Sequence, residues 1–196
     1  MKIIGITGGV GCGKSTVLHL IKKHANAYII MADDVAKSLY TSGSSLVNGI
    51  ADEFGAACIN SDGSVNKTAL ADIIFSDENK RKKLNAMVHP EVKRIILETI
   101  DKLKLINTYD LVLIEAALFF EEEYDKFCDE VWYVTAKISV RKDRLKSDRG
   151  YSDEKIDSIL KAQLPENEFM KKCDKVIDNS GSLYDTETCL VKMLEL

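Results

Sequence analysis

Hydrophobic residues along the chain follow two patterns, short unbroken runs and longer segments with helical spacing. The unbroken runs are rich in isoleucine, valine and leucine and cover 2–7, 27–31, 110–115, 130–135 and 175–178. Such runs are typical of strands that are buried on both faces of a parallel sheet. The pattern therefore predicts about five parallel strands.

Amphipathic helices are predicted between these strands. Residues 17–21 place apolar side chains on one side, and residues from about 91 to 106 repeat apolar positions at three- and four-residue spacing. Ser152 and Ser182 precede two further helical segments, and we interpret both serines as N-caps. Strands that alternate with helices predict an α/β fold with a doubly wound parallel sheet.

One interval breaks this alternation. The residues between the second and third strands are too many for a single crossover connection, and they are mostly helical around an Asp62-Gly63 turn. We interpret 36–108 as a helical subdomain inserted into the sheet. The chain is then one domain, 1–196, whose sheet-forming core comprises 1–35 and 109–196.

The composition excludes several classes of protein. Of the 196 residues, 45% are hydrophobic, 30% are charged and 2 are proline, which is typical of a globular domain and excludes a disordered chain. No apolar run approaches the roughly 20 residues that span a bilayer. A net charge of −4 disfavours a protein that coats nucleic acid, because such proteins need a basic face.

The cysteines point to a reducing compartment. There are 5 of them, scattered and without a Cys-x-x-Cys pair, so neither a disulfide framework nor a zinc site is indicated. The first residues lack the apolar stretch of a signal peptide. We therefore expect a cytoplasmic protein in which most of the thiols are small buried hydrophobic groups.

A phosphate-binding motif comes directly after the first predicted strand. Residues 8–15, Gly-Gly-Val-Gly-Cys-Gly-Lys-Ser, fit G-x-x-x-x-G-K-[ST] and open a helix. The glycines let backbone N–H groups point at phosphate oxygens, and the helix N-terminus adds partial positive charge. Lys14 can reach the β- and γ-phosphates, and the Ser15 hydroxyl can bind Mg²⁺. The motif predicts a P-loop NTPase fold that binds a nucleoside triphosphate, but it does not define the reaction.

A kinase also needs a group that orients and deprotonates the attacking hydroxyl. Asp33 and Asp34 come after the second strand, at the edge where open α/β sheets bind ligands. Spacing alone does not choose between the two, nor between catalysis and a stabilising position at a helix N-terminus. Glu115 ends the third strand like a Walker B acid, where it can hold Mg²⁺ through water or cap the next turn.

The segment 137–149 is basic, with six lysines or arginines against two aspartates and a local charge of +4. Such a run is commonly a solvated helix face. This one comes after a central strand and ends at Arg149, just before the break that precedes Ser152. Its position predicts a lid over 137–165 that brings Arg144 or Arg149 onto the transferring phosphoryl group.

Taken together, these motifs resemble the dephospho-coenzyme A kinase family over essentially the whole chain. Residues 5–16 resemble the family's G-L-T-G-G-I-G-S-G-K-S, residues 32–36 its D-A-D-x-x-A, and residues 118–121 its P-L-L-F-E. Further matches are His89-Pro90, Arg144, Arg149, Gln163 and Val176-Ile177-Asp178-Asn179. Each match is weak alone, but their order along the chain is specific.

The resemblance implies ATP-dependent phosphorylation of the 3′-hydroxyl on the ribose of dephospho-CoA, with Mg²⁺ as cofactor. It implies that Asp33 is the general base and that Lys14, Arg144 and Arg149 stabilise phosphoryl charge. The insert around His89 resembles the acceptor-binding region. The implied ATP-binding residues are Gly9, Val10, Gly11, Cys12, Gly13, Lys14, Ser15 and Thr16, and the expected metal-binding residues are Ser15 and Glu115. We expect a monomer or weak homo-oligomer with a small-molecule substrate and neither nucleic acid nor membrane as a partner.

Three positions depart from the family pattern. Met31 replaces the first aspartate of D-A-D, so an auxiliary role of that acid is absent or has passed to Asp34. Ala117 stands where proline is usual, which loosens that loop. Cys12 replaces a serine, and its thiol either is a tolerated small group or has a pKa lowered by Lys14 and the helix N-terminus.

The sequence also leaves other functions open, and another role for His89. His89, which precedes a proline, can equally mark a helix boundary. Another small-molecule kinase, for a nucleoside or nucleotide, has the same P-loop, and so has a regulatory module that binds ATP without an acceptor. A GTPase switch is disfavoured because Asn66-Lys67-Thr68-Ala69 lacks the aspartate of a guanine-reading motif. The helical insert, Asp33 and the basic segment favour a kinase.

Overall fold

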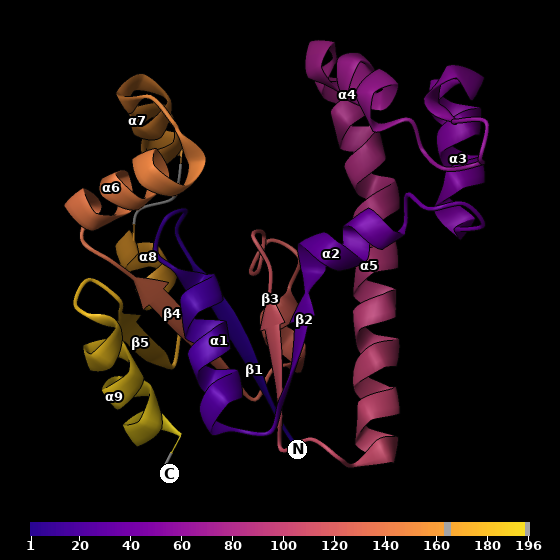
Figure 1. The fold of residues 1–196 in the computed structure, drawn as a ribbon. Helices are drawn as coiled ribbons and strands as arrows, with labels where there is room; N and C mark the ends of the chain where they lie inside the picture. The colour runs from indigo at the N-terminus through magenta and orange to yellow at the C-terminus, as the bar shows by residue number, and fades with distance from the viewer. Residues whose placement is uncertain (163–165, 195–196) are drawn as a thin grey trace. The chain divides into compact units, whose positions relative to one another are not determined.

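The structure, a computed structural model, describes residues 1–162 and 166–194 (Figure 1). The chain divides into two compact units. One, which we call the sheet unit, comprises Met1–Ile29 and Ile106–Leu196, and the other, the helical unit, comprises Ile30–Leu105. The boundary therefore assigns Asp33 to the helical unit rather than to the sheet-forming segment 1–35.

The five predicted strands are present. Their bounds are β1 Lys2–Gly8, β2 Ala27–Met31, β3 Leu111–Glu115, β4 Glu130–Thr135 and β5 Lys175–Asp178. Within the described residues they form one sheet in the order β2-β3-β1-β4-β5. The pairs β1–β3, β1–β4 and β4–β5 are parallel, so the predicted α/β class with a parallel sheet is confirmed.

Burial separates the central strands from the edge strands. In β1, β3 and β4 nearly every side chain is buried, as the unbroken apolar runs predict. In β2 and β5 fewer side chains are buried, and Tyr28 and Val176 are exposed. The prediction of strands buried on both faces is wrong for these two, because they are the edge strands of the sheet and lie at the margin of the core.

The sheet unit also contains short helices. They are α1 Lys14–His24, η2 Tyr124–Phe127, α6 Ile138–Arg149, α7 Asp153–Ala162, α8 Glu166–Met170 and α9 Leu183–Met193. Ser152 Oγ accepts a hydrogen bond from the backbone N–H of Lys155 at 3.3 Å, and Ser182 forms a capping box with Asp185. Both predicted N-caps are therefore confirmed.

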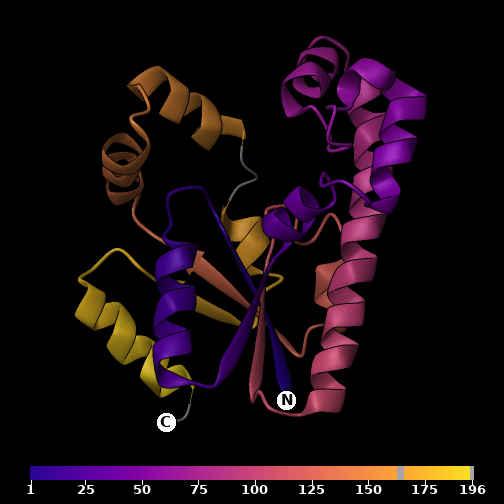
Figure 2. The same cartoon turned by 45° about the vertical axis from the view of Figure 1, so that its right-hand side comes forward.

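Helices α1 and α9 lie side by side in both views (Figures 1 and 2). Glu187 of α9 contacts Lys23 Nζ and His24 Nε2 of α1 through one carboxylate oxygen, at 2.6 Å each. Apolar residues within 17–21 of α1 are buried as predicted. The helix that begins at the phosphate loop is thus fixed within the sheet unit by ion pairs and by apolar burial.

The helical unit contains α2 Ala32–Ser38, α3 Ser45–Phe54, η1 Ala56–Cys58, α4 Lys67–Ser76 and most of α5 Glu78–Ile106. A short antiparallel bridge joins Ile59 and Val65 around the predicted Asp62-Gly63 turn. The Asp62 carboxylate accepts from the backbone N–H of Ser64 at 2.9 Å, which lowers the pKa of Asp62 together with the Ser64 hydroxyl. No described helix, in either unit, is both long enough and apolar enough to cross a bilayer.

Helix α5 differs from its prediction. It spans 29 residues, begins at Glu78 rather than near 91, and continues through Pro90. Proline cannot donate to the carbonyl four residues earlier and normally ends or kinks a helix. Here a buried apolar stripe continues on both sides of the proline, formed by Leu84, Val88, Val92, Ile96, Ile100 and Leu103. Tertiary burial outweighs the missing hydrogen bond, and the interpretation of His89 as a helix-boundary residue is wrong.

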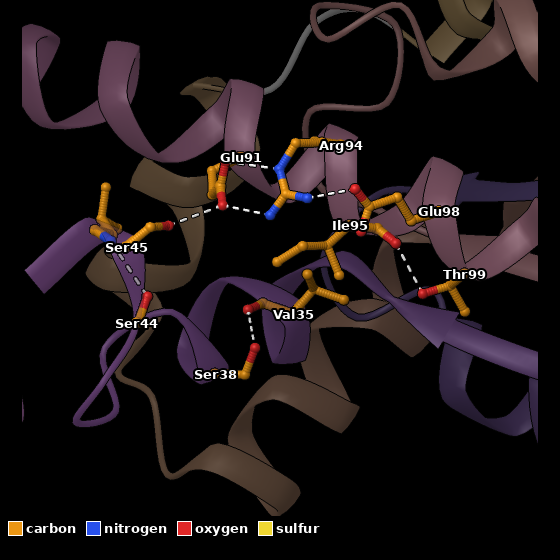
Figure 3. Close-up of polar contacts among 10 residues, drawn as sticks. Val35, Ser38, Ser44, Ser45, Glu91, Arg94, Ile95, Glu98 and Thr99 are labelled. Carbon is orange, nitrogen blue, oxygen red and sulfur yellow. Dashed lines mark hydrogen bonds and ion pairs between the residues drawn. The ribbon is translucent and has the colours of Figure 1, made fainter.

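A polar network joins α3 to α5 in the helical unit (Figure 3). Glu91 accepts from Arg94 Nε at 3.0 Å and Nη2 at 2.6 Å, and from Ser45 Oγ at 3.0 Å. Arg94 Nη1 also donates to Glu98. The guanidinium lowers the pKa of Glu91 by hydrogen bonding. The first residue of α3 is thereby tied to the middle of the long helix.

Candidate active site

The phosphate loop lies between the end of β1 and the start of α1. Gly11 and Gly13 have φ angles of 80° and 84°, in the left-handed region that favours glycine. Gly13 is also the N-cap of α1, and a Cβ atom added there would lie 2.2 Å from Asn179 Nδ2. Glycine at 13 is therefore required twice, by its backbone conformation and by the side chain that approaches it.

Side chains bind two of the loop's carbonyl oxygens. Lys14 Nζ donates to the carbonyl of Gly8 at 3.0 Å. Arg141 Nε, from α6, donates to the carbonyl of Val10 at 2.9 Å. Arg141 is buried, so a charged donor that is excluded from water is used to fix the backbone of this loop.

A third carbonyl, that of Cys12, accepts two side-chain donors. Asn179 Nδ2 donates to it at 2.8 Å, and Arg144 Nη1 donates at 3.3 Å. Arg144 Nη2 also donates to the carbonyl of Asn179, at 2.8 Å. The arginine thus connects the phosphate loop to the segment just after β5.

The three bound carbonyls orient the intervening peptides. In a trans peptide the N–H points opposite to the C=O of the same peptide plane. The N–H groups of Gly9, Gly11 and Gly13 are therefore directed away from Lys14, Arg141 and Asn179. Backbone N–H groups that are oriented by fixed carbonyls at a helix N-terminus can bind an anion without rearranging.

Lys14 and Glu115 lie together beside the loop. Lys14 Nζ is 3.3 Å from Glu115 Oε1. Glu115 ends β3 and is only 7% exposed, and β3 pairs with β1 so that Glu115 is opposite Ile6. Parallel pairing thus brings the predicted Walker B carboxylate to the predicted phosphate-binding lysine.

The basic segment forms helix α6, which packs against α7. Arg144 is half-buried against the phosphate loop, whereas Arg149 is the exposed last residue of α6. The ion pairs Lys142–Asp157, at 2.6 Å, and Lys146–Asp153, at 2.7 Å, connect α6 to α7. Gln163, a family match within the expected lid, lies outside the described residues.

The thiol of Cys12 does not have the lowered pKa that the sequence suggested. Cys12 is fully buried, and burial raises its pKa more than Arg141 and Lys14 lower it. Desolvation disfavours a thiolate even next to cationic groups. Cys12 is therefore a small buried side chain within the phosphate loop, which was the first of the two alternatives, and the alternative of an activated thiol is wrong.

Two predicted acceptor-side residues belong to the helical unit. Asp33 is exposed in the first turn of α2, directly after the end of β2. Its neighbour Asp34 forms an ion pair with Lys37 within the same helix, at 2.7 Å. His89 is half-buried in α5, before Pro90. Of the two adjacent aspartates, Asp34 is the one whose carboxylate is engaged by a lysine.

Comparison with known proteins decides between the kinase families. The chain matches the family model described as dephospho-CoA kinase over residues 2–185. It belongs to the dephospho-CoA kinase family. A dephospho-CoA kinase from Aquifex aeolicus is 36% identical over 196 residues, which cover 100% of this chain and 97% of that relative. One from Moorella thermoacetica is 37% identical over 186 residues, 95% of this chain and 87% of the relative.

A solved structure of a member of the dephospho-CoA kinase family has the same fold. The dephospho-CoA kinase from Campylobacter jejuni superposes with a TM-score of 0.74 at 25% identity and covers 100% of this chain and 96% of that one. The P-loop kinase fold predicted from the motif at 8–15 is thereby confirmed.

Three residues at the loop were not predicted from the sequence as site residues. Arg141 belonged to the basic segment but had no role assigned, and Asn179 was only a family match. Thr186, which donates to Asn179 Oδ1 at 2.9 Å, was not singled out at all. A polar residue directly after a predicted strand was the available signal for Asn179, since this is the edge where α/β sheets bind ligands.

Proposed function

We propose that this chain transfers the γ-phosphoryl group of ATP to the 3′-hydroxyl on the ribose of dephospho-CoA, yielding CoA and ADP. One observation carries the proposal: a phosphate loop with oriented N–H groups and the Lys14–Glu115 pair occurs in a chain that matches the family over residues 2–185. The reaction is the final step of coenzyme A synthesis.

On the donor side, Gly9, Val10, Gly11, Cys12, Gly13, Lys14, Ser15 and Thr16 bind the triphosphate. The N–H groups of the loop contact phosphate oxygens, and the Lys14 ammonium neutralises charge on the β- and γ-phosphates. Arg144 and Arg149 stabilise the charge of the transferring group. Arg144 has donors to spare for this, because a guanidinium carries five N–H groups and its described bonds come from Nη1 and Nη2.

Ser15 and Glu115 fit a magnesium ion chemically. Mg²⁺ prefers oxygen ligands and is usually bound by one or two protein groups together with substrate phosphates. Ser15 offers a hydroxyl at the start of α1, and Glu115 offers a carboxylate already buried beside the loop. When bound, Mg²⁺ neutralises charge on the β- and γ-phosphates.

On the acceptor side, Asp33 accepts the proton of the 3′-hydroxyl. Its carboxylate comes after β2 at the end where parallel strands present ligand-binding residues, whereas Asp34 is paired with Lys37. The helical segment 36–108, which includes His89, binds dephospho-CoA. The described residues of the predicted lid, 137–162, close over the transferring group. We place the reaction in the cytoplasm, in a monomer or weak homo-oligomer.

The test measures release of ADP with four acceptor conditions: dephospho-CoA, adenosine, uridine and none. We expect turnover to be stimulated strongly by dephospho-CoA and little by the nucleosides. Stimulation by adenosine or uridine alone would indicate a nucleoside kinase. Equal ADP release in all four conditions, with ATP bound, would indicate the regulatory module and contradict the proposal.

A further inference from the structure

A buried polar chain connects helix α9 to the phosphate loop. The Thr186 hydroxyl donates to Asn179 Oδ1 at 2.9 Å, and Asn179 Nδ2 donates to the carbonyl of Cys12 at 2.8 Å. Thr186 is 0% exposed and Asn179 is 2% exposed. The Thr186 hydroxyl also lies 3.4 Å from the carbonyl of Ser182 in its own helix, but its shorter bond is to Asn179. Both polar side chains are thus excluded from water and have hydrogen-bond partners.

The two hydrogen bonds of the Asn179 side chain allow only one orientation of its amide. The Cys12 carbonyl can only accept, so the NH₂ group of Asn179 must face it, and the amide oxygen must face Thr186. The Asn179 backbone is fixed separately, because its N–H donates to the carbonyl of Thr135 at 2.8 Å and its carbonyl accepts from Arg144. The remaining freedom of Asn179 is rotation of its side chain, which the Thr186 hydroxyl opposes.

We propose that Thr186 is a positioning residue for ATP binding, acting through Asn179 on the Cys12–Gly13 peptide. With the hydroxyl present, Asn179 holds the Cys12 carbonyl away from the phosphates and the Gly13 N–H toward them. Without it, Asn179 Oδ1 is buried and unsatisfied, and the amide turns to find a donor. The Cys12 carbonyl then keeps only the longer bond from Arg144 Nη1, at 3.3 Å, so the Gly13 peptide is oriented less tightly, although no residue that contacts the nucleotide has changed.

Thr186→Val tests this inference because valine keeps the shape of threonine and removes the hydroxyl. We expect the dissociation constant for ATP to rise about tenfold, since weakening one N–H bond to a charged phosphate oxygen is enough for a change of that size. The KM for dephospho-CoA should change by less than about twofold, because the affected peptide belongs to the nucleotide loop. Thr186→Ser, which retains the hydroxyl, should restore most of the ATP affinity.

Thr188→Val is the matched control. Thr188 lies in the same helix, is half-buried and is not part of the chain to Asn179. Its substitution should leave the ATP dissociation constant within about twofold of wild type, as is usual for changes away from a site. Melting temperatures of both variants separate a loss of folding from a loss of positioning. If Thr186→Val does not fold, Thr186→Ala removes the same hydroxyl without introducing a second methyl group and carries the same expectation.

A double-mutant cycle tests whether Thr186 acts through Asn179. In an Asn179→Ala background, Thr186→Val should cause no further change in ATP affinity, since the two residues act as one unit. Additive losses would show that Thr186 acts elsewhere, and an unchanged ATP affinity in folded Thr186→Val would overturn the inference. The inference rests on the proposed binding of ATP by the loop, so wild-type ATP binding is measured first. A wild-type protein that does not bind ATP would refute the proposed function, whereas one that binds ATP independently of Thr186 would refute only this inference.

Discussion

At the scale of single residues, the two adjacent aspartates after β2 differ in what surrounds them. Both lie in the first turn of α2, where acids are favoured by the helix dipole. Asp34 is engaged by Lys37, whose pKa is raised by that hydrogen bond and by the charges of Asp34 and Asp33. This difference favours Asp33 as the acid available to an acceptor hydroxyl.

Asp33→Asn should separate catalysis from nucleotide binding. Asparagine keeps the shape of the side chain but cannot accept the hydroxyl proton, so we expect kcat to fall about 100-fold or more, the scale of a lost general base. The dissociation constant for ATP should stay within about twofold, because the phosphate loop is unchanged. Steady-state kinetics and calorimetry with ATP measure the two quantities.

Asp34→Asn is the matched control for this variant. It removes an exposed ion pair within one helix turn, a kind of contact that contributes little, and we expect kcat to change by less than about threefold. Turnover at the wild-type rate in Asp33→Asn would remove Asp33 as the base. A comparable loss of kcat in both variants would assign the role to the pair rather than to one residue.

Residue roles could be predicted from the sequence only where the partners are local. Lys14 and Ser15 belong to a motif that is complete within eight positions, so roles could be proposed for both from the sequence alone. The donor to the Cys12 carbonyl comes from 167 positions away and the donor to Val10 from 131. The pKa of Cys12 depends on burial by these distant segments, which is why its direction could not be predicted from neighbouring residues.

At the scale of elements, periodicity located the strands well and the long helix poorly. An unbroken apolar run has clear ends, and each observed strand agrees with its prediction to within about one residue, well inside the usual boundary error. For α5 the proline rule suggested a boundary at 90, but a stripe of buried side chains spans it. A local rule failed because packing in the helical unit supplies more stabilisation than the missing hydrogen bond removes.

Pro90→Ala should therefore stabilise the protein. Alanine restores the donor to the Ala86 carbonyl and is the better helix former, so we expect the free energy of unfolding to rise by about 1–3 kcal/mol. Urea denaturation followed by far-UV circular dichroism measures the change. Lys102→Ala, at an exposed position of the same helix, should change the value by less than about 0.5 kcal/mol. A destabilised Pro90→Ala variant would contradict this view of α5. It would indicate that proline stabilises the backbone conformation of the helix at this position.

Helix α6 carries two kinds of basic residue. Arg141 and Arg144 bind carbonyls at or next to the phosphate loop, whereas Lys142 and Lys146 form ion pairs with α7. The local charge of +4 predicted a lid, but part of this charge is committed to the backbone of the nucleotide site. The residues of α6 that contact the loop are thus distinct from Arg149, which is exposed at the end of the helix.

At the scale of the whole molecule, the net charge of −4 hides a strongly uneven distribution. Cationic groups gather around the phosphate loop from α1 and α6. A small anionic ligand needs only this local environment, whereas a long polyanion needs an extended basic face. The exclusion of nucleic acid from overall charge therefore never conflicted with a nucleotide as substrate.

The proposed reaction requires binding of a phosphoryl donor and binding of an acceptor, and the residues proposed for the two tasks fall mainly in different units. The sheet unit contains the phosphate loop, Glu115 and α6, and the helical unit contains Asp33 and His89. The insert at 36–108 stays a prediction, drawn from a helical pattern that interrupts the alternation of strands and helices. The acceptor that it binds could not be predicted from this pattern, since the recognition of a substrate depends on side chains that no periodicity locates. The family resemblance supplied that expectation.

The central claim is tested most directly by identifying the phosphorylated product. The protein is incubated with dephospho-CoA and ATP labelled in the γ-phosphate, and the product is analysed by chromatography against authentic CoA and by ³¹P NMR. The account predicts a single labelled product that co-elutes with CoA and carries a new 3′-phosphomonoester, formed in equal amount to ADP. Label that appears only in inorganic phosphate, or in an ester at another position of dephospho-CoA, would contradict it.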